Sequence, residues 1–448
     1  MSNKKAEGAF TPKLRFPEFQ DAAEWENEEL GDMYFFKPTN SYSRDQLNYE
    51  NGSVKNIHYG DIHTKFSTLF DITKENVPFV NPSESLDKIT PESYCVEGDI
   101  VFADASEDME DVGKSIEVVH LNNEKLLAGM HTLLARQKKR KIIVGFGGYL
   151  FKSNRIRSQI KREAQGAKVF GISANRLLNI DICFPADKKE QQKIADCLTS
   201  LDDLISLQRK KVDALKAYKK GLLQNLFPAE GESLPRLRFP EFQDAGEWEI
   251  QELGQVTREF RDGDWIESKD QSNSGVRLVQ TGNVGNGEFI FKDGSARYIS
   301  ENTFNRLNCT EIFPGDCLIS RLPDPIGRAC LVPDLKQRLI TAVDCAIVRF
   351  DYQKVIPYIF VLYSQTNYYL DKVNSFGSGS TRKRISRENL SHIEIPFPSL
   401  PEQQKIADLL TSIDEQIVAQ SQRLAALQVH KKGLLQQLFP STPPAGEG

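Results

Sequence analysis

Two stretches of the chain carry apolar residues in alternating steps of three and four, the spacing of a helix seam that packs against another helix. The first seam consists of Ile194, Leu198, Leu201, Ile205, Val212, Leu215, Leu222 and Leu226. The second consists of Ile406, Leu410, Ile413, Ile417, Leu424, Leu427, Leu434 and Leu438. This period favours a coiled coil over a plain amphipathic helix. It predicts two long helices, over 188–228 and 401–440.

Start and stop signals agree with these two helices. The first begins with a capping-box spacing, Asp187 followed three residues later by Glu190, and ends before Pro228. The second begins with Ser399 and Glu402 at the same spacing and ends before Pro440. A helix of about forty residues is roughly 60 Å long. Because the two seams match position for position, we expect the helices to pair with each other. Two separate helices, each packed on its own domain, are the alternative.

The chain repeats itself around these helices. The letters LRFPEFQDA stand at 14–22 and again at 237–245, and EQQKIAD stands at 190–196 and 402–408. KKGLLQNLFP at 219–228 returns as KKGLLQQLFP at 431–440. The middles of the two half-chains differ, although GDIVFAD at 98–104 parallels GDCLISR at 315–321. Near-identical ends with divergent middles predict one shared scaffold that carries two different domains, whereas the alternative is a recent duplication without functional meaning.

The relative direction of the two long helices follows from how the chain connects them. Residues 229–400 lie between the end of the first helix and the start of the second, and compact domains often bring their termini together. We therefore expect the helices to run antiparallel, as a rigid spacer with one domain at each end. Gln208 and Gln420 lie in the seams and could fix the register. Gly221 and Gly433 each weaken a helix interior, which indicates a close backbone approach, either between the helices or to another protein.

The segments outside the helices mix short strand-like runs, turn signals and short helices. They predict mixed α/β domains over 1–187 and 229–400, followed after the second helix by a disordered tail at 441–448. The whole chain is then a pseudo-two-fold internal repeat of mixed α/β class, with two globular domains separated by an antiparallel coiled coil.

Composition narrows the function classes for these 448 residues. The net charge of −5 argues against a uniformly basic nucleic-acid coat, but a local basic face remains possible. No apolar run is long enough for a membrane span, and the first residues do not resemble a signal peptide. The seven cysteines form no CxxC pair, so a zinc ribbon or a disulfide framework is not expected. We expect a cytoplasmic protein with no membrane partner and no metal of its own.

Basic residues gather in both half-chains. Segment 136–162 is rich in Lys and Arg, contains no Asp or Glu, and has aromatic residues between its charges; segment 376–390 places basic residues beside a Gly/Ser-rich loop. Such side chains suit phosphate contacts, and Arg suits base edges. A charge run is more often only a solvated face. The DNA-binding candidates are Lys138, Lys139, Arg140, Lys141, Arg155, Arg157, Arg321, Arg382, Lys383, Arg384 and Arg387.

Motifs of catalysis are missing or broken. VGKS at 112–115 lacks the first glycine of a phosphate loop, and the six histidines form no HExxH pair. Asp324, Asp334 and Lys336 formally fit a metal-dependent nuclease pattern, but the first half-chain has no counterpart. The hypotheses are therefore a non-catalytic DNA-binding module, a nuclease or methyltransferase that acts alone, and a structural adaptor that joins two proteins.

The repeated blocks resemble the specificity subunit of type I restriction–modification systems. The resemblance rests on the LRFPEF…W…LG openings at 14–31 and 237–254, on GDI and GDC, on GSTRKRIS…IP.P at 379–398, and on the helices at 190–228 and 401–440. It implies two target-recognition domains that each read half of a split, asymmetric DNA site. The first domain departs from the pattern, because 167–180 lacks the Arg-rich loop of 380–390, so its contacts could shift to 136–162.

The resemblance also implies partners. The paired helices would set the gap between the half-sites and dock two methyltransferase subunits, which carry S-adenosylmethionine. Restriction and translocase subunits that use ATP and Mg would join through the complex, so no catalytic residue and no cofactor are expected in this chain. The residues expected to bind the methyltransferase subunits are Lys219, Lys220, Gly221, Leu222, Leu223, Lys431, Lys432, Gly433, Leu434 and Leu435.

Overall fold

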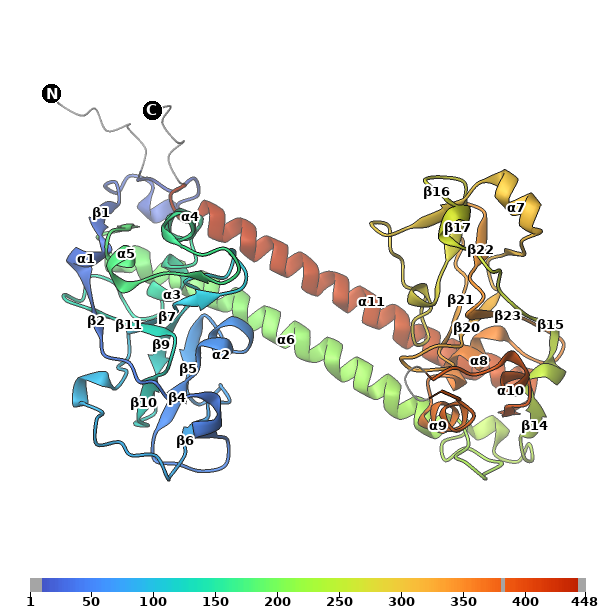
Figure 1. Cartoon of the computed structure of the whole chain (residues 1–448). Helices are drawn as coiled ribbons and strands as arrows, with labels where there is room; N and C mark the ends of the chain where they lie inside the picture. Colours follow the sequence, from blue (N-terminus) through green and yellow to red (C-terminus); the bar gives the residue numbers. More distant parts are fainter. Residues whose placement is uncertain (1–9, 380–382, 442–448) are drawn as a thin grey trace. The chain divides into compact units, whose positions relative to one another are not determined.

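The computed structural model describes residues 10–379 and 383–441. It divides into two compact units, one containing residues up to Gln208 together with those from Arg423 onward, the other containing Arg209–Gln422. The two longest helices, α6 (Lys188–Leu226) and α11 (Leu400–Gln437), each contribute residues to both units. They are the green and red helices of Figure 1 and confirm the two helices expected from the apolar seams.

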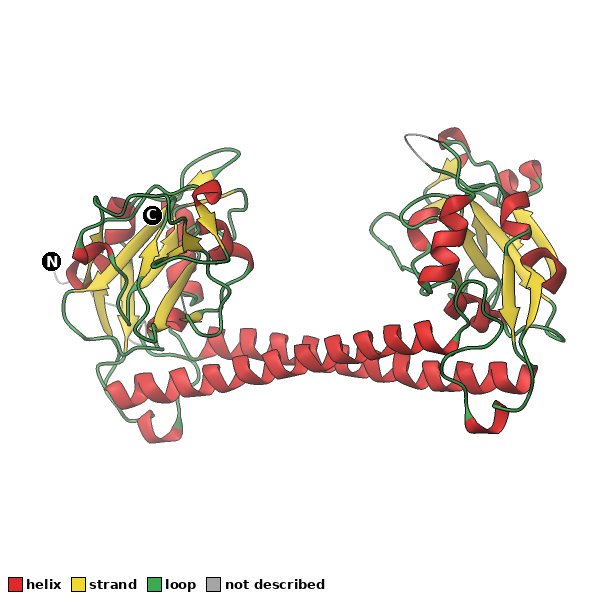
Figure 2. Cartoon of the chain, turned by 90° about the horizontal axis from the view of Figure 1, so that it is seen from below, coloured by secondary structure: helices red, strands yellow, loops and turns green. Residues whose placement is uncertain are grey.

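The first unit is built on two main sheets (Figures 1 and 2). The larger has the order β2-β11-β7-β9-β5, with strands Tyr34–Lys37, Thr132–Gln137, Ile100–Ala103, Ser115–His120 and Leu69–Asp71. The other has the order β10-β4-β6-β3, with strands Leu126–Ala128, Lys55–Ile57, Phe79–Val80 and Leu47–Asn48. The short helices are α1 (Leu30–Met33), α2 (Tyr59–Thr64), α3 (Gly147–Leu150), α4 (Asn154–Glu163) and α5 (Ala174–Leu178).

The second unit repeats this plan with different residues (Figure 2). One sheet has the order β15-β23-β20-β21, with strands Thr257–Asp262, Cys345–Phe350, Cys317–Ser320 and Ala329–Leu331. The other has the order β16-β18-β17-β22-β19, with strands Gln271–Ser272, Arg297–Ile299, Val276–Val279, Leu339–Thr341 and Glu311–Ile312. Its short helices are α7 (Glu301–Leu307), α8 (Pro357–Tyr363), α9 (Asn367–Ser375) and α10 (Arg387–Ser391). Each unit is mixed α/β, as the sequence predicts.

Each repeated opening block is fastened to the start of a long helix. Strand β1 (Glu26–Glu29) pairs with β13 (Asp181–Phe184), the strand before α6; β14 (Glu249–Glu252) pairs with β24 (Glu394–Phe397), before α11. Glu190 accepts two hydrogen bonds of 2.7 Å from Arg15 and one of 3.2 Å from the Trp25 indole. The second unit repeats this network with Arg238, Trp248 and Glu402.

The glutamine after each of these glutamates holds the globular part of the unit. In the first unit the Gln191 amide accepts from the backbone of Ile143 and donates to the carbonyls of Lys141 and Pro185. In the second unit Gln403 makes the same three contacts, with the backbones of Ile356, Lys354 and Pro398. Both side chains are 1% exposed or less. The repeated letters EQQ are therefore identical because they bind the same groups in both units.

The end of each long helix packs in the unit where the other long helix begins. Leu438 and Phe439 follow the end of α11 and lie in the core of the first unit, together with Ile194 and Leu198 of α6. Leu222, Leu226 and Phe227 lie in the core of the second unit, together with Ile406 and Leu410 of α11. Within each unit the start of one helix thus lies beside the end of the other, so the helices run antiparallel, as expected.

An ion pair between the helices accompanies this packing in each unit. Lys431 of α11 binds Asp202 of α6, which also accepts a 2.8 Å hydrogen bond from Tyr149. In the second unit Lys219 of α6 binds Asp414 of α11 at 2.6 Å, and Asp414 accepts from Tyr358. The tyrosines come from the globular parts. Each network therefore ties both helices to the domain beside them.

Candidate nucleic-acid interface

The basic run of the first domain is divided by the fold. Lys138, Lys139 and Arg140 are exposed after the end of β11, and Lys138 donates to the Gly31 carbonyl. Lys141 pairs with Glu26 and Glu28 of β1. The exposed basic residues of segment 136–162 are thus Lys138, Lys139 and Arg140, next to a lysine paired with two glutamates, and Arg162 near the end of the segment.

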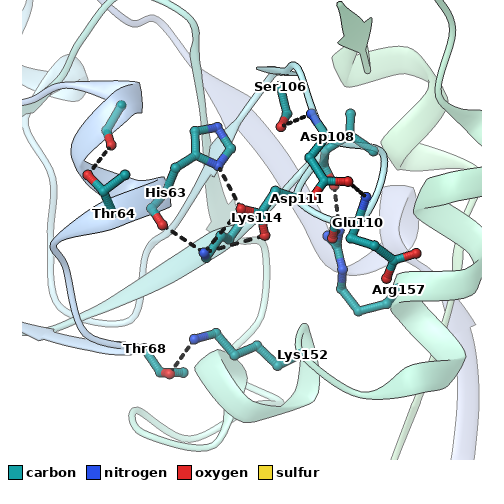
Figure 3. Close-up of polar contacts among 12 residues, drawn as sticks. His63, Thr64, Thr68, Ser106, Asp108, Glu110, Asp111, Lys114, Lys152 and Arg157 are labelled. Carbon is teal, nitrogen blue, oxygen red and sulfur yellow. Dashed lines mark hydrogen bonds and ion pairs between the residues drawn. The ribbon is translucent and has the colours of Figure 1, made fainter. Parts of the chain in front are cut away.

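Helix α4 carries three arginines, of which Arg155 is buried, Arg157 is half-buried and Arg162 is exposed. Arg155 is 7% exposed, stacks over the Phe10 ring at 5.1 Å and donates to the Ser441 carbonyl. Arg157 donates to the carbonyls of Glu110 and Val112, and burial lowers the pKa of its guanidinium (Figure 3). The contribution of Arg155 and Arg157 to DNA binding stays a prediction, and the contacts that the structure gives them stabilise the domain.

Two lysines outside the predicted set lie near Arg157 (Figure 3). Lys114 donates to the His63 carbonyl at 2.8 Å and pairs with Asp111, whereas Lys152 donates to the Thr68 hydroxyl. Burial, together with the charges of Lys431 and Lys114, lowers the pKa of Lys152 to about 8. Lys152 lies within the basic segment 136–162, so that segment is the sequence pattern that could have identified it. Lys114 is the lysine of VGKS at 112–115, a pattern that resembles a phosphate loop and not a basic patch.

The basic residues of the second domain gather around two aspartates. Arg321 pairs with Asp262 of β15, and the Arg387 guanidinium lies 3.9 Å from the same carboxylate. Arg384 pairs with Asp344 at 2.9 Å. The fold thus brings three of the predicted arginines together although they are distant in sequence. Lys383 is exposed and donates to the Asn374 side chain, whereas Arg382 lies outside the described residues.

The lysines and leucines expected to bind partner subunits fall into three groups. Lys220 and Lys432 are exposed, whereas Lys219 and Lys431 make the ion pairs between the helices. The leucines serve the cores within the chain: Leu222 and Leu223 are buried in the second unit, and Leu434 and Leu435 pack partly buried in the first. The docking role of this set stays a prediction.

The two helix glycines face open space. Apart from the neighbouring residues and the backbone of its own helix turns, a Cβ atom added at Gly221 or Gly433 would meet no atom of the chain within 4 Å. The structure therefore contradicts a close approach between the helices, one of the two explanations that the sequence left open. The other explanation, an approach by another protein, remains.

No metal site accompanies the nuclease-like pattern. Asp334 and Lys336 pair with each other at the surface, where the lysine side chain is 85% exposed. Among the described residues no three His, Cys, Asp or Glu side chains are grouped as metal ligands. Among the same residues, none of the helices has the length and apolarity needed to cross a membrane.

Known proteins match both units. Residues 23–217 and 245–429 each match the type I restriction modification DNA specificity domain family. The type I restriction enzyme MjaX specificity subunit of Methanocaldococcus jannaschii is 26% identical over 434 residues, covering 93% of each chain. The MjaVIII specificity subunit of the same organism is 23% identical over 334 residues, which is 73% of this chain and 76% of the relative.

Solved structures share the fold. The S subunit of a type I restriction–modification system from M. genitalium covers 97% of this chain and is itself covered completely, at 14% identity with a TM-score of 0.53. A chain from a study of assembly and conformational transition in a type I system covers 94%, and 98% of it is matched, at 18% identity with a TM-score of 0.58. These matches confirm the expected fold class, and the family match confirms a specificity subunit rather than a catalytic one. The chain belongs to the type I restriction–modification DNA specificity family.

Proposed function

We propose that this chain reads a split, asymmetric DNA site, with one half-site bound by each globular domain. One observation carries the proposal. The contacts that fasten each domain to the long helices are the same in both units, whereas equivalent positions of the globular parts carry different residues. Glu190 and Glu402 bind the same Arg and Trp partners, yet Asp104 stands where the second unit has Arg321. A constant scaffold with two different surfaces suits two different sequences.

The names of the relatives support this proposal. Both archaeal relatives are called specificity subunits of type I restriction enzymes. Arginines grouped as Arg321, Arg384 and Arg387 are suited to phosphates and to guanine edges, which present two acceptors in the major groove. Each of the three is also close to an aspartate, which holds the guanidinium in place before DNA arrives.

The partners are part of the proposal. A chain that only binds DNA needs an enzyme beside it, and the repeated helix ends offer two equivalent places for identical subunits. We place the two methyltransferase subunits there, with S-adenosylmethionine bound in them and not in this chain. Restriction and translocase subunits that use ATP and Mg would join through the same complex. The antiparallel helices would set the gap between the half-sites.

The test is selection of duplexes from a random-sequence library by the full chain assembled with its methyltransferase subunit. We expect enrichment of two different short motifs at a fixed separation. Enrichment of one continuous motif would contradict the two-domain assignment, and no enrichment would contradict DNA reading altogether. Methyltransferase subunit without this chain is the control and should enrich nothing.

The open space at the helix glycines leads to a prediction about docking. The double substitution Gly221→Ala with Gly433→Ala should stabilise the helices by up to about 1 kcal/mol per site, because alanine favours the helix and its methyl meets no atom of the chain. The same methyls should weaken methyltransferase binding roughly tenfold or more, because overpacking an interface costs about 1–3 kcal/mol. Thermal unfolding and calorimetric titration with the methyltransferase measure the two effects.

A matched control is Ala214→Gly, on an exposed position of α6. It should lower helix stability by about 1 kcal/mol and leave methyltransferase affinity unchanged. Unchanged affinity in the double glycine variant would show that the methyltransferase binds elsewhere on the chain.

A further inference from the structure

One backbone position is equivalent in the two domains but carries opposite charge. It follows β7 in the first unit and β20 in the second, and the residue there is Asp104 or Arg321. In both units its backbone amide donates to the carbonyl of the residue before the next central strand, at 3.0 Å before β11 and at 2.9 Å before β23. Its carbonyl accepts from the backbone amide of an isoleucine, at 2.8 Å in the first unit and 3.2 Å in the second. These partners are His131 and Ile172 in the first unit, Asp344 and Ile385 in the second.

The side chains around this position differ in kind. In the first unit Asp104 Oδ1 lies 3.3 Å from His131 Nδ1, and the two side chains are 29% and 51% exposed. We call this pair the acidic corner. In the second unit Arg321 is held by Asp262 beneath the surface, while Arg384 pairs with Asp344 and is 44% exposed. We call Arg321, Asp344 and Arg384 the basic corner.

Each corner contains a buried polar atom that the protein leaves without a hydrogen bond. In the acidic corner this atom is the acceptor Asp104 Oδ1, whose neighbour is the His131 imidazole. In the basic corner it is the donor Arg321 Nε. Buried polar atoms are nearly always paired, so two unpaired atoms at equivalent positions require an explanation. Burial also raises the pKa of the Asp104 carboxyl, while His131 opposes the change. Each corner therefore contains one polar atom without a well-aligned hydrogen bond, an acceptor in the first unit and a donor in the second.

The acidic corner is bordered by rings and a cation. His63 Nε2 lies 3.0 Å from the Ala105 carbonyl, next to Asp104 in the chain. The Tyr59 ring centroid lies 5.3 Å from that of His131 and 6.3 Å from that of His63. Lys114 donates to the His63 carbonyl, which places an ammonium group near the same loop (Figure 3). Aromatic and imidazole faces with a lysine nearby suit contact with a nucleic acid.

We propose that the two corners are the base-reading positions of the two domains. In this proposal, which rests on the proposed function, Asp104 accepts a hydrogen bond from the exocyclic amino group of cytosine or adenine in one half-site. Arg384, with Arg321 beneath it, donates to a guanine in the other. A carboxylate matches an amino donor in the major groove and a guanidinium matches the two guanine acceptors. An acidic residue on a DNA-binding face is costly against phosphates, which a reading role explains.

The test compares the full chain with its Asp104→Asn variant, each assembled with methyltransferase subunits, by selection from a random duplex library. An asparagine keeps the shape but adds donors. We expect discrimination to fall roughly tenfold or more at one base pair of one half-site, with the other half-site unchanged. Glu107→Gln removes the same charge from an exposed position on the same segment. This control should change affinity for all sequences alike.

A uniform change of affinity in the Asp104→Asn variant, equal to that of the control, would overturn the proposal while leaving the proposed function intact. Absence of any enriched motif with the natural chain would overturn both. Because Asp104 is partly buried, two further variants keep the test decisive if Asp104→Asn does not fold. His131→Asn, at a residue with a φ of 57° that asparagine tolerates, should alter the same base pair, and Arg384→Ala should alter the other half-site.

Discussion

Glu190→Ala is expected to lower the free energy of unfolding of the first unit by about 3–5 kcal/mol, the range found when one partner of a buried ion pair is removed. The Glu190 side chain is 1% exposed, and it is the acceptor for Arg15 and for the Trp25 indole. Its loss leaves a guanidinium that is 8% exposed without its charge partner. Urea denaturation measures the loss in the free energy of unfolding. Hydrogen exchange at the amides of β7 and β11 shows whether the loss is in the first unit.

The helix itself offers a matched control one turn away. Lys193 pairs with Glu18 at 3.1 Å, but these side chains are 52% and 47% exposed. Lys193→Ala should therefore cost less than about 1 kcal/mol, because solvent screens such a pair. Glu402→Ala should repeat the large loss in the second unit. A loss below about 1 kcal/mol for both glutamates would show that the shared blocks do not fasten the domains in the way described.

Phe439→Ala is expected to destabilise the first unit by about 3–5 kcal/mol, the cost of truncating a buried aromatic residue. The residue is 2% exposed, and its ring centroid lies 5.9 Å from that of Trp25 and 5.6 Å from that of Phe146. The residue belongs to the second repeat in sequence but to the first unit in space. Hydrogen exchange should therefore accelerate in β7 and β11 and stay unchanged in β20 and β23.

Phe227→Ala is the reciprocal variant. Its ring lies 5.9 Å from Trp248 and 5.6 Å from Tyr363, so its loss should accelerate exchange in β20 and β23 alone. If Phe439→Ala loosened the second unit instead, each helix end would serve its own repeat. The antiparallel pairing within the units would then be wrong.

The scaffold could be predicted from the sequence because its signals are local and repeated. The apolar steps from Ile194 to Leu226 indicate one helix seam, and the second copy confirms the period. The same repeats could not show why EQQ is identical in both copies. Glu190 binds residues far away in the sequence, and Gln191 binds three backbone groups, which only the folded chain brings together. The proposed register role of Gln208 and Gln420 stays a prediction.

The candidate site was harder to predict because charge alone does not show where a side chain points. Arg155 and Arg157 stand in a basic run, yet the fold turns them inward, toward Phe10 and two carbonyls. Asp104 and His131 do not stand out in the sequence, because an acidic residue is not an obvious DNA contact. The sequence signal for Asp104 was the last letter of GDIVFAD against GDCLISR, and its meaning depended on the backbone contacts that make the two positions equivalent.

The central claim is that two unlike domains on one shared scaffold each specify half of a DNA site. The most direct measurement is a map of methylated adenines in DNA from cells that make this chain with its methyltransferase subunit. The claim predicts methylation within one motif of two different halves at a constant separation. Exchange of residues 32–180 for those of another member of the family should change one half alone. A continuous motif, or a change in both halves after that exchange, would contradict it.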